Sequence, residues 1–295
     1  MSNLQTADIG LGQTILRRAA ISPNKPAITF EGQSQTFAEL GDRVRRMAAV
    51  LRAGGISAGD RVGYIGFNHP VFLEMLYACG CLGAVFVPLN FRLTGPEVRF
   101  IANDAGISTL VVDDMLRPII DEERANLECT RYITAEADAD NWEALEPLMV
   151  AAQPIEASEK VDGDDVAFIM YTSGTTGLPK GAMLTHGNIF WNSINVCFGD
   201  DGISGTTLTC APLFHIGGLN VTTLLSLGMG VEVVLLRSFD AGQVLALIEK
   251  HKVTTMFGAP TMFLMMAQHE NFATSDLSSI DAMTCGGAPV PVPLI

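Results

Sequence analysis

The chain has 295 residues, of which 48% are hydrophobic and 17% are charged, so it can bury a sizeable core and does not belong to the disordered class. Its 18 Lys and Arg residues against 32 Asp and Glu residues give a formal net charge of −14. This balance argues against a nucleic-acid partner, because phosphate backbones attract basic patches.

Signals for secretion and membrane insertion are not found. The N-terminal residues lack the basic and apolar regions of a signal peptide. Two long uncharged stretches, 75–91 and 202–231, are interrupted by Gly and Pro and do not form the apolar run of about 20 residues that a spanning helix needs. Peripheral membrane contact stays open.

Six cysteines without CxxC spacing mostly lie in apolar runs, which indicates buried free thiols and a reducing cytoplasm.

Helices and strands alternate in the first half of the chain. A Glu31–Gly32 turn is expected to join two strands, and Thr36 with Glu39 has the spacing of a capping box at the start of a helix that ends near Ala53. The other elements expected here are helices at 14–21, 71–82 and 96–104 and strands at 60–67, 84–89 and 108–114. The acidic segment 127–161 is interpreted as surface structure and a connection between lobes.

A second alternating run follows. Its expected strands are 165–172, 181–186, 206–212, 231–236, 254–259 and 281–286, and its expected helices start near 187, after His215, and at 241 and 261. This order predicts an α/β fold with parallel-rich sheets covered by helices. We expect two lobes, 1–162 and 163–295, of which the second carries the candidate site described next.

Hydroxyl side chains, glycines and one lysine are concentrated in YTSGTTGLPKG, residues 171–181. The stretch starts where an apolar strand is predicted to end, and ligands of open α/β sheets bind beyond the carboxyl ends of strands. Glycines allow close backbone approach, and successive N–H groups can form an anion-binding concavity. With Lys180, this composition predicts a polyphosphate site. A plain Gly/Thr turn is one alternative. An unrelated NTPase is another, but the Walker A pattern fails because Pro179 precedes the lysine and Gly181 follows it.

Several stretches resemble motifs of the adenylate-forming enzymes, which include acyl-CoA synthetases and aryl-CoA ligases. YTSGTTGLPKGAMLTH resembles their signature loop, APLFHIGGL (211–219) their second motif, and CGGAPVPVP (285–293) the segment that forms a wall of the adenine site. The region from GDRVGYIGF onward is also similar, so the resemblance covers essentially the whole chain. It implies the fold of the family's large N-terminal domain.

The resemblance also implies a two-step reaction. A carboxylic acid attacks the α-phosphate of ATP to give an acyl-adenylate and pyrophosphate, and the thiol of coenzyme A then displaces AMP. ATP, Mg²⁺ and coenzyme A are the implied cofactors, and no protein metal ligand is assigned. The phosphate contacts are assigned by the resemblance to Thr172, Ser173, Gly174, Thr175, Thr176, Gly177 and Lys180, and the adenine contacts to Gly287, Ala288 and Pro289.

His215 is the candidate catalytic residue, because the family often places a residue of the second motif beside the acyl carboxylate. Amino-acid-activating members tend to carry Asp directly after the Phe of this motif, whereas here Phe214 is followed by His215. This difference favours a fatty, aryl or alicyclic acid. A satisfied core histidine is the alternative, and His186, next to the signature loop, has a weaker claim to a direct role.

The family pattern is not complete in these residues. The YG-T-E and TGD motifs and the small C-terminal domain with its catalytic lysine are not found, so the chain is expected to be the N-terminal portion of a ligase, with its second lobe incomplete. The isolated chain is not expected to complete the reaction. A non-catalytic remnant or a nucleotide- or acyl-binding module is the alternative. The identity of the acid and the oligomeric state stay open.

Overall fold

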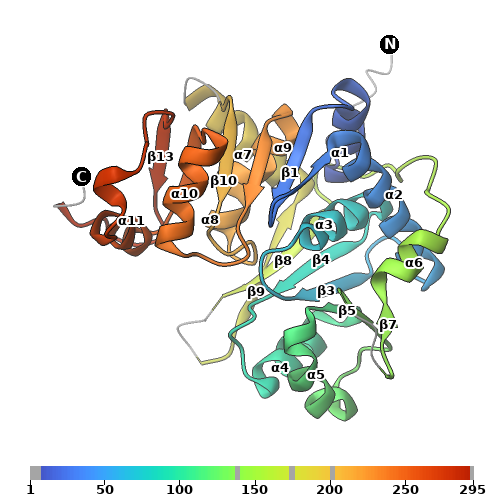
Figure 1. Ribbon diagram of the computed structural model, residues 1–295. Helices are drawn as coiled ribbons and strands as arrows, with labels where there is room; N and C mark the ends of the chain where they lie inside the picture. The colour runs from blue at the N-terminus through green and yellow to red at the C-terminus, as the bar shows by residue number, and fades with distance from the viewer. Residues whose placement is uncertain (1–7, 137–139, 173–176, 200–202, 293–295) are drawn as a thin grey trace. The chain divides into compact units, whose positions relative to one another are not determined.

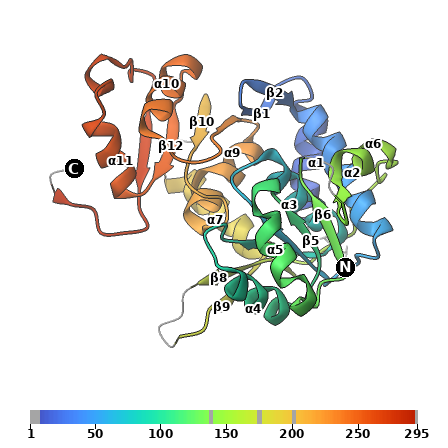
Figure 2. The same cartoon turned by 60° about the horizontal axis from the view of Figure 1, so that its bottom comes forward.

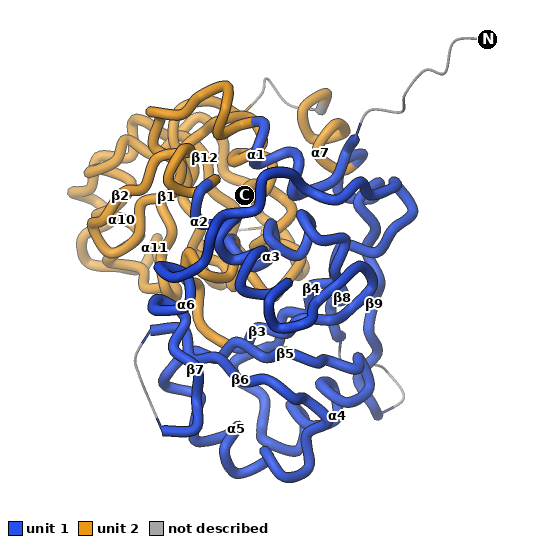
Figure 3. The backbone as a smooth tube through the Cα atoms, turned by 90° about the vertical axis from the view of Figure 1, so that its right-hand side faces the viewer, with its two compact units in different colours: residues 1–17, 42–65, 74–191 blue, residues 18–41, 66–73, 192–295 orange. Residues whose placement is uncertain are grey.

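A computed structural model describes residues 8–136, 140–172, 177–199 and 203–292. The chain forms two compact units that alternate along the sequence, and Figure 3 colours them separately. Unit 1 comprises 1–17, 42–65 and 74–191, and unit 2 comprises 18–41, 66–73 and 192–295. Each unit contains one β-sheet. The division into lobes at residue 162 stays a prediction.

The sheet of unit 1 has the strand order β7-β6-β5-β3-β4-β8-β9 and is parallel except for the antiparallel pair β8–β9. Its strands are β3 (Arg61–Ile65), β4 (Val85–Leu89), β5 (Ile107–Val112), β6 (Arg131–Thr134), β7 (Glu143–Ala144), β8 (Val166–Thr172) and β9 (Lys180–Thr185). Helices α4 (Gly95–Ala105) and α5 (Arg117–Glu123) cover one face (Figure 1) and bury Ile101 and Ile120 against Leu110. The apolar faces of these helices and strands form the core of unit 1.

The sheet of unit 2 has the strand order β13-β12-β10-β11-β1-β2 and is parallel except for the hairpin β1–β2. Its strands are β1 (Pro26–Phe30), β2 (Gln33–Thr36), β10 (Thr206–Thr209), β11 (Glu232–Leu235), β12 (Thr255–Gly258) and β13 (Ala282–Cys285). Helices α10 (Ala241–His251) and α11 (Pro260–Gln268) pack on it through Val244, Ile248 and Met262.

The remaining helices are α1 (Leu11–Ile21), α2 (Phe37–Ala53), α3 (Pro70–Leu82), α6 (Leu145–Ala151), α7 (His186–Gly199), α8 (Ile216–Gly218) and α9 (Leu224–Met229), with a π-helical turn (Leu219–Thr223) between the last two. Among the described residues, no helix is long and apolar enough to cross a membrane. All six cysteines are free, and Cys79, Cys81, Cys129 and Cys210 are buried.

The structure confirms the predicted α/β class. The Glu31–Gly32 turn has positive φ at both residues, and Thr36 and Glu39 form the expected reciprocal capping bonds. The segment 127–161 differs from its interpretation as surface and connection, because it contributes β6 to the sheet and buries Ile133. The helix expected after His215 is divided by the π-helical turn. The sequence gives no strong signal for either feature. β6, for example, has only 4 residues and follows a segment with few apolar residues.

A buried ion pair joins helices of unit 1. Glu74 of α3 is fully buried, and Arg43 of α2 donates to it twice, from Nε to Oε1 at 2.6 Å and from Nη2 to Oε2 at 3.0 Å. Glu146 of α6 accepts two further bonds from the same guanidinium. Burial would lower the pKa of Arg43, but the hydrogen bonds and charges of Glu146 and Glu74 raise it. This pairing offsets the cost of burying a carboxylate.

Replacing Arg43 by Met should therefore lower the free energy of unfolding by about 3–5 kcal/mol, because Glu74 stays buried without its bidentate partner. Urea denaturation monitored by circular dichroism measures the loss. Arg52→Met is the control, since its ion pair with Glu159 is exposed and should be worth less than about 1 kcal/mol. The double variant Arg43→Met/Glu74→Leu should recover most of the stability, and equal losses in Arg43→Met and Arg52→Met would contradict this account.

Candidate functional site

The predicted phosphate loop connects the two strands of the β8–β9 hairpin. Thr172, the last residue of β8, lies opposite Lys180, the first residue of β9, and Tyr171 lies opposite Gly181. The antiparallel pairing thus holds the two ends of the loop side by side. Gly177 has φ of +109°, in the region that favours glycine. The predicted contacts Ser173, Gly174, Thr175 and Thr176 lie outside the described residues.

Tyr171 fixes the start of this loop within unit 1. Its hydroxyl donates to Oδ2 of Asp104 in α4 at 2.5 Å, and Figure 2 shows α4 beside the hairpin. Burial, the hydrogen bond and the charge of Asp104 all raise the pKa of Tyr171, so the phenol stays a donor. Gly181 allows this ring to lie on β9, because a Cβ there would be 2.7 Å from Cγ2 of Ile169 and 3.1 Å from the ring.

Lys180 supplies the cation of the loop. Its side chain is exposed, and no carboxylate among the described residues pairs with it. In a chain with a formal charge of −14, an uncompensated ammonium at the end of a strand is available to an anionic ligand. Thr172 is also exposed, so its hydroxyl is available as a second donor. The described part of the loop can therefore bind phosphate oxygens.

The second motif and the predicted adenine wall lie at one edge of the sheet of unit 2. His215 follows β10 and Gly287 follows β13, and both strands are parallel neighbours of β12, so their carboxyl ends share that edge. The ring of Phe257, at the end of β12, lies between the two segments. A Cβ at Gly217 would be 2.6 Å from Cζ of this ring, and one at Gly286 would be 3.3 Å from Cε2. The two glycines therefore allow the segments to approach each other around Phe257.

His215 begins the short helix α8. Its side chain is exposed, and Nδ1 accepts a hydrogen bond of 3.2 Å from the backbone N–H of Gly217. Because Nδ1 accepts, the neutral imidazole carries its proton on Nε2. His215 thus presents an N–H donor that can bind a carboxylate oxygen, which differs from the satisfied core histidine considered as the alternative.

The predicted adenine wall is an exposed turn. Gly287 has φ of +83°, and Gly287, Ala288 and Pro289 are all exposed. Small residues in this turn leave room for a planar ring to pack against the backbone.

Several apolar residues of the 256–266 segment have packing roles. Met256, Met262 and Met266 are buried in the core with α10, whereas Met265 is 53% exposed.

His186 has a structural place in unit 1. It is 1% exposed, and its Nδ1 accepts a hydrogen bond of 3.2 Å from the backbone N–H of Leu11. Burial lowers the pKa of this imidazole, although the charges of Asp165 and Asp8 act in the opposite direction. A buried, neutral histidine that fastens the start of α1 differs from a ligand-binding group.

Asn68 is a positioning residue that the sequence patterns did not identify. Its side chain is 3% exposed, and Nδ2 donates to the carbonyls of Ala211 and Leu236 at 3.0 Å each. Its Oδ1 accepts from the N–H of Leu213 at 2.8 Å. One amide thus fastens the segment that leads to His215 to the end of β11. A lone Asn in GFNHP carries no spacing signal, so only the structure could reveal this role.

The predicted site residues are divided between the units. Thr172, Gly177 and Lys180 belong to unit 1, where the hairpin brings Thr172 and Lys180 together. His215 and the segment 287–289 belong to unit 2, where they share the edge of a sheet. Within the described ranges, no group of three or more His, Cys, Asp and Glu side chains is placed to hold a metal ion.

Comparisons with known proteins agree with the resemblance that the motifs indicated. The family model described as AMP-binding enzyme matches residues 15–295. A feruloyl-CoA synthase from Amycolatopsis sp is 45% identical over 286 residues, and an indoleacetate–CoA ligase from Aromatoleum aromaticum is 36% identical over 287 residues; each match covers 97% of this chain and 56% of the relative. The structure of a Mycobacterium tuberculosis fatty acyl CoA synthetase matches with a TM-score of 0.88 at 32% identity, over 97% of this chain and 56% of that one. The chain spans little more than half the length of these relatives.

Replacing Asn68 by Asp should lower the free energy of unfolding by about 2–4 kcal/mol, because two donated hydrogen bonds are lost and two buried carbonyls then face a carboxyl group. Chemical denaturation measures the loss. Asn24→Asp, at an exposed position of the same unit, is the control and should change stability by less than about 0.5 kcal/mol. A loss no larger than that of the control would show that Asn68 does not fasten the segment before His215.

Proposed function

We propose that this chain, which belongs to the family of AMP-binding enzymes, carries the nucleotide-binding and acid-binding part of an ATP-dependent acid–CoA ligase. The reaction joins a carboxylic acid to AMP with release of pyrophosphate, and coenzyme A then displaces AMP to give the thioester. The observation that carries this proposal is the β8–β9 hairpin, whose strand register places Lys180 opposite Thr172 at the ends of a Gly- and hydroxyl-rich loop.

The first step brings a carboxylate toward a polyphosphate, so like charges must be compensated. One pair of unit charges at about 4 Å costs about 1 kcal/mol in water and about 4 kcal/mol at an effective dielectric constant near 20. In this proposal Lys180 and the hydroxyls and N–H groups of residues 172–177 bind the β- and γ-phosphates, and Mg²⁺ arrives with the nucleotide. Such preorganised donors act mainly through positioning and charge stabilisation.

His215 is proposed to bind the carboxylate of the acid. The hydrogen bond from Gly217 to Nδ1 leaves Nε2–H as the outward donor, so the ring can orient a carboxylate oxygen without itself being the nucleophile. Gly287, Ala288 and Pro289 are proposed to pack against the adenine. The free thiols of all six cysteines support a reducing cytoplasm as the location.

An aryl acid is the substrate class that we favour among the fatty, aryl and alicyclic acids. His215 replaces the acidic residue that would pair with an α-ammonium group, which argues against amino acids. The relatives at 45% and 36% identity are named for ferulate and indoleacetate, and both of these acids carry an aromatic ring.

The test is acid-dependent exchange of labelled pyrophosphate into ATP, measured on the protein at the length that its gene encodes. Ferulate, indoleacetate, decanoate and cyclohexanecarboxylate sample the three acid classes, and we expect the aryl acids to give the fastest exchange. Ligand-induced stabilisation without exchange or AMP formation for any acid would favour a binding module. Phosphate release from ATP without any acid would favour an unrelated NTPase.

Replacing Lys180 by Met should lower kcat/KM for ATP in this exchange by about 10- to 100-fold, because a charged hydrogen bond to the phosphates is lost. Lys160→Met is the matched control, since Lys160 is also an exposed lysine of unit 1 but lies outside the loop. An unchanged kcat/KM in Lys180→Met would remove Lys180 from the phosphate site.

A further inference from the structure

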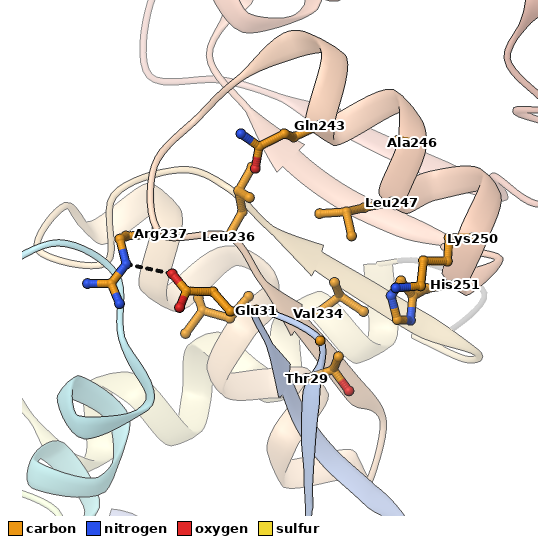
Figure 4. Close-up of a pocket in the computed structure, with 12 residues that line it drawn as sticks. Thr29, Glu31, Val234, Leu236, Arg237, Gln243, Ala246, Leu247, Lys250 and His251 are labelled. Carbon is orange, nitrogen blue, oxygen red and sulfur yellow. Dashed lines mark hydrogen bonds and ion pairs between the residues drawn. The ribbon is translucent and has the colours of Figure 1, made fainter.

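Unit 2 contains a pocket that none of the predicted site residues lines. Its volume is about 230 Å³, and it opens between α10, the end of β11 and the β1–β2 turn (Figure 4). This volume is below the roughly 300–1,000 Å³ of pockets for drug-sized ligands, which indicates a small ligand. The lining residues are Thr29, Glu31, Gly32, Val234, Leu235, Leu236, Arg237, Gln243, Ala246, Leu247, Lys250 and His251.

The middle of the pocket is apolar. Val234 and Leu236 of the β11 segment face Leu247 of α10, and Ala246 adds a methyl group at the exposed rim. The neighbouring face of α10 is buried in the core through Val244 and Ile248, and Leu247 packs against the edge of the same core. On the pocket face of this helix, Ala246 and Leu247 form an apolar patch between the polar Gln243 and the basic Lys250 and His251. An uncovered apolar recess of this size suits a ring or a short acyl chain.

The two ends of the pocket differ in charge. At one end Glu31 accepts a hydrogen bond from Arg237 at 2.7 Å, and this guanidinium also lies over the ring of Phe30, so the pair is close to neutral. At the other end lie Lys250 and His251, and no carboxylate among the described residues pairs with either. The helix dipole accounts for basic residues in the last turn of α10. It does not account for the apolar recess beside them.

From this geometry we propose that the pocket is a second acid-binding site, which takes a small carboxylate with an apolar body, such as an aryl acid or a short acyl acid. The body lies on Val234, Leu236 and Leu247, and the carboxylate lies at Lys250 and His251. At the far end Arg237 is already paired with Glu31, whereas Lys250 has no carboxylate partner among the described residues, and this difference favours the stated orientation. The site uses none of the residues assigned to the reaction, so it does not depend on the proposed function.

Photolabelling with 4-azidocinnamate, followed by mass spectrometry of peptides, tests the proposal on the whole chain. We expect labelled peptides from residues 232–252, and unlabelled cinnamate should suppress this labelling. Cinnamamide, which has the same body without the charge, should need a concentration at least about tenfold higher, because charged hydrogen bonds are stronger than neutral ones.

Two variants test the two parts of the pocket separately. Lys250→Gln/His251→Gln removes the basic end, and Ala246→Phe fills the apolar recess while keeping Lys250 and His251. Each should reduce labelling of residues 232–252 by at least about fivefold. Lys25→Gln, an exposed lysine of the same unit outside the pocket, should leave it unchanged. Thermal melting of each variant separates lost binding from lost folding.

Several outcomes would overturn the second acid-binding site. One is labelling restricted to residues 211–219 or 256–289, which would assign the acid to the predicted catalytic segments alone. Another is equal competition by cinnamamide, which would make the pocket a neutral apolar site. Protection by inorganic phosphate as effective as that by cinnamate would make it a simple anion site. A folded Ala246→Phe variant with full labelling would place the probe elsewhere.

Discussion

Reversal of chain direction at a single pair of strands determines what the candidate phosphate loop can do. In a parallel sheet, a loop that leaves the carboxyl end of a strand normally leads into a helix on one face. Here β8 pairs antiparallel with β9, so the loop returns at once and its two ends stay a strand spacing apart. Backbone pairing therefore holds Lys180 at one end and Thr172 at the other side by side, and the bond from Tyr171 to Asp104 holds the outgoing strand on α4.

Unit 2 brings the His215 segment and the segment 287–289 together in another way. Three parallel strands deliver their carboxyl ends to one edge, and the side chains there must share limited space. The ring of Phe257 fits there because Gly217 and Gly286 have no side chains and leave the volume that it fills. Asn68 holds the segment before His215 in place, because its amide bonds to the carbonyl of Ala211 and the N–H of Leu213.

Local patterns predicted the elements well, because each carries its own signal. The Glu31–Gly32 turn, the Thr36 capping box and the alternation of apolar strands with amphipathic helices are all written within a few residues, and the structure has them. Features that depend on distant partners could not be read in this way. β6 is a strand because β5 pairs with it, and Asn68 matters because residues more than 140 positions away need its hydrogen bonds. The roles of Lys180 and His215 came from a family resemblance, and the structure adds their local geometry.

The buried amide of Asn68 also has a kinetic consequence. The N–H of Leu213 lies in a connecting segment, where backbone amides usually exchange their hydrogen with solvent through small local openings. Its acceptor, however, is a side chain that is 3% exposed and that donates at the same time to the carbonyls of Ala211 and Leu236. Movement of the Asn68 side chain away from this amide would also break its bonds to the carbonyls of Ala211 and Leu236. The connection before His215 should thus open on the timescale of the surrounding sheet, so that an irregular segment behaves as part of the slow-exchanging core.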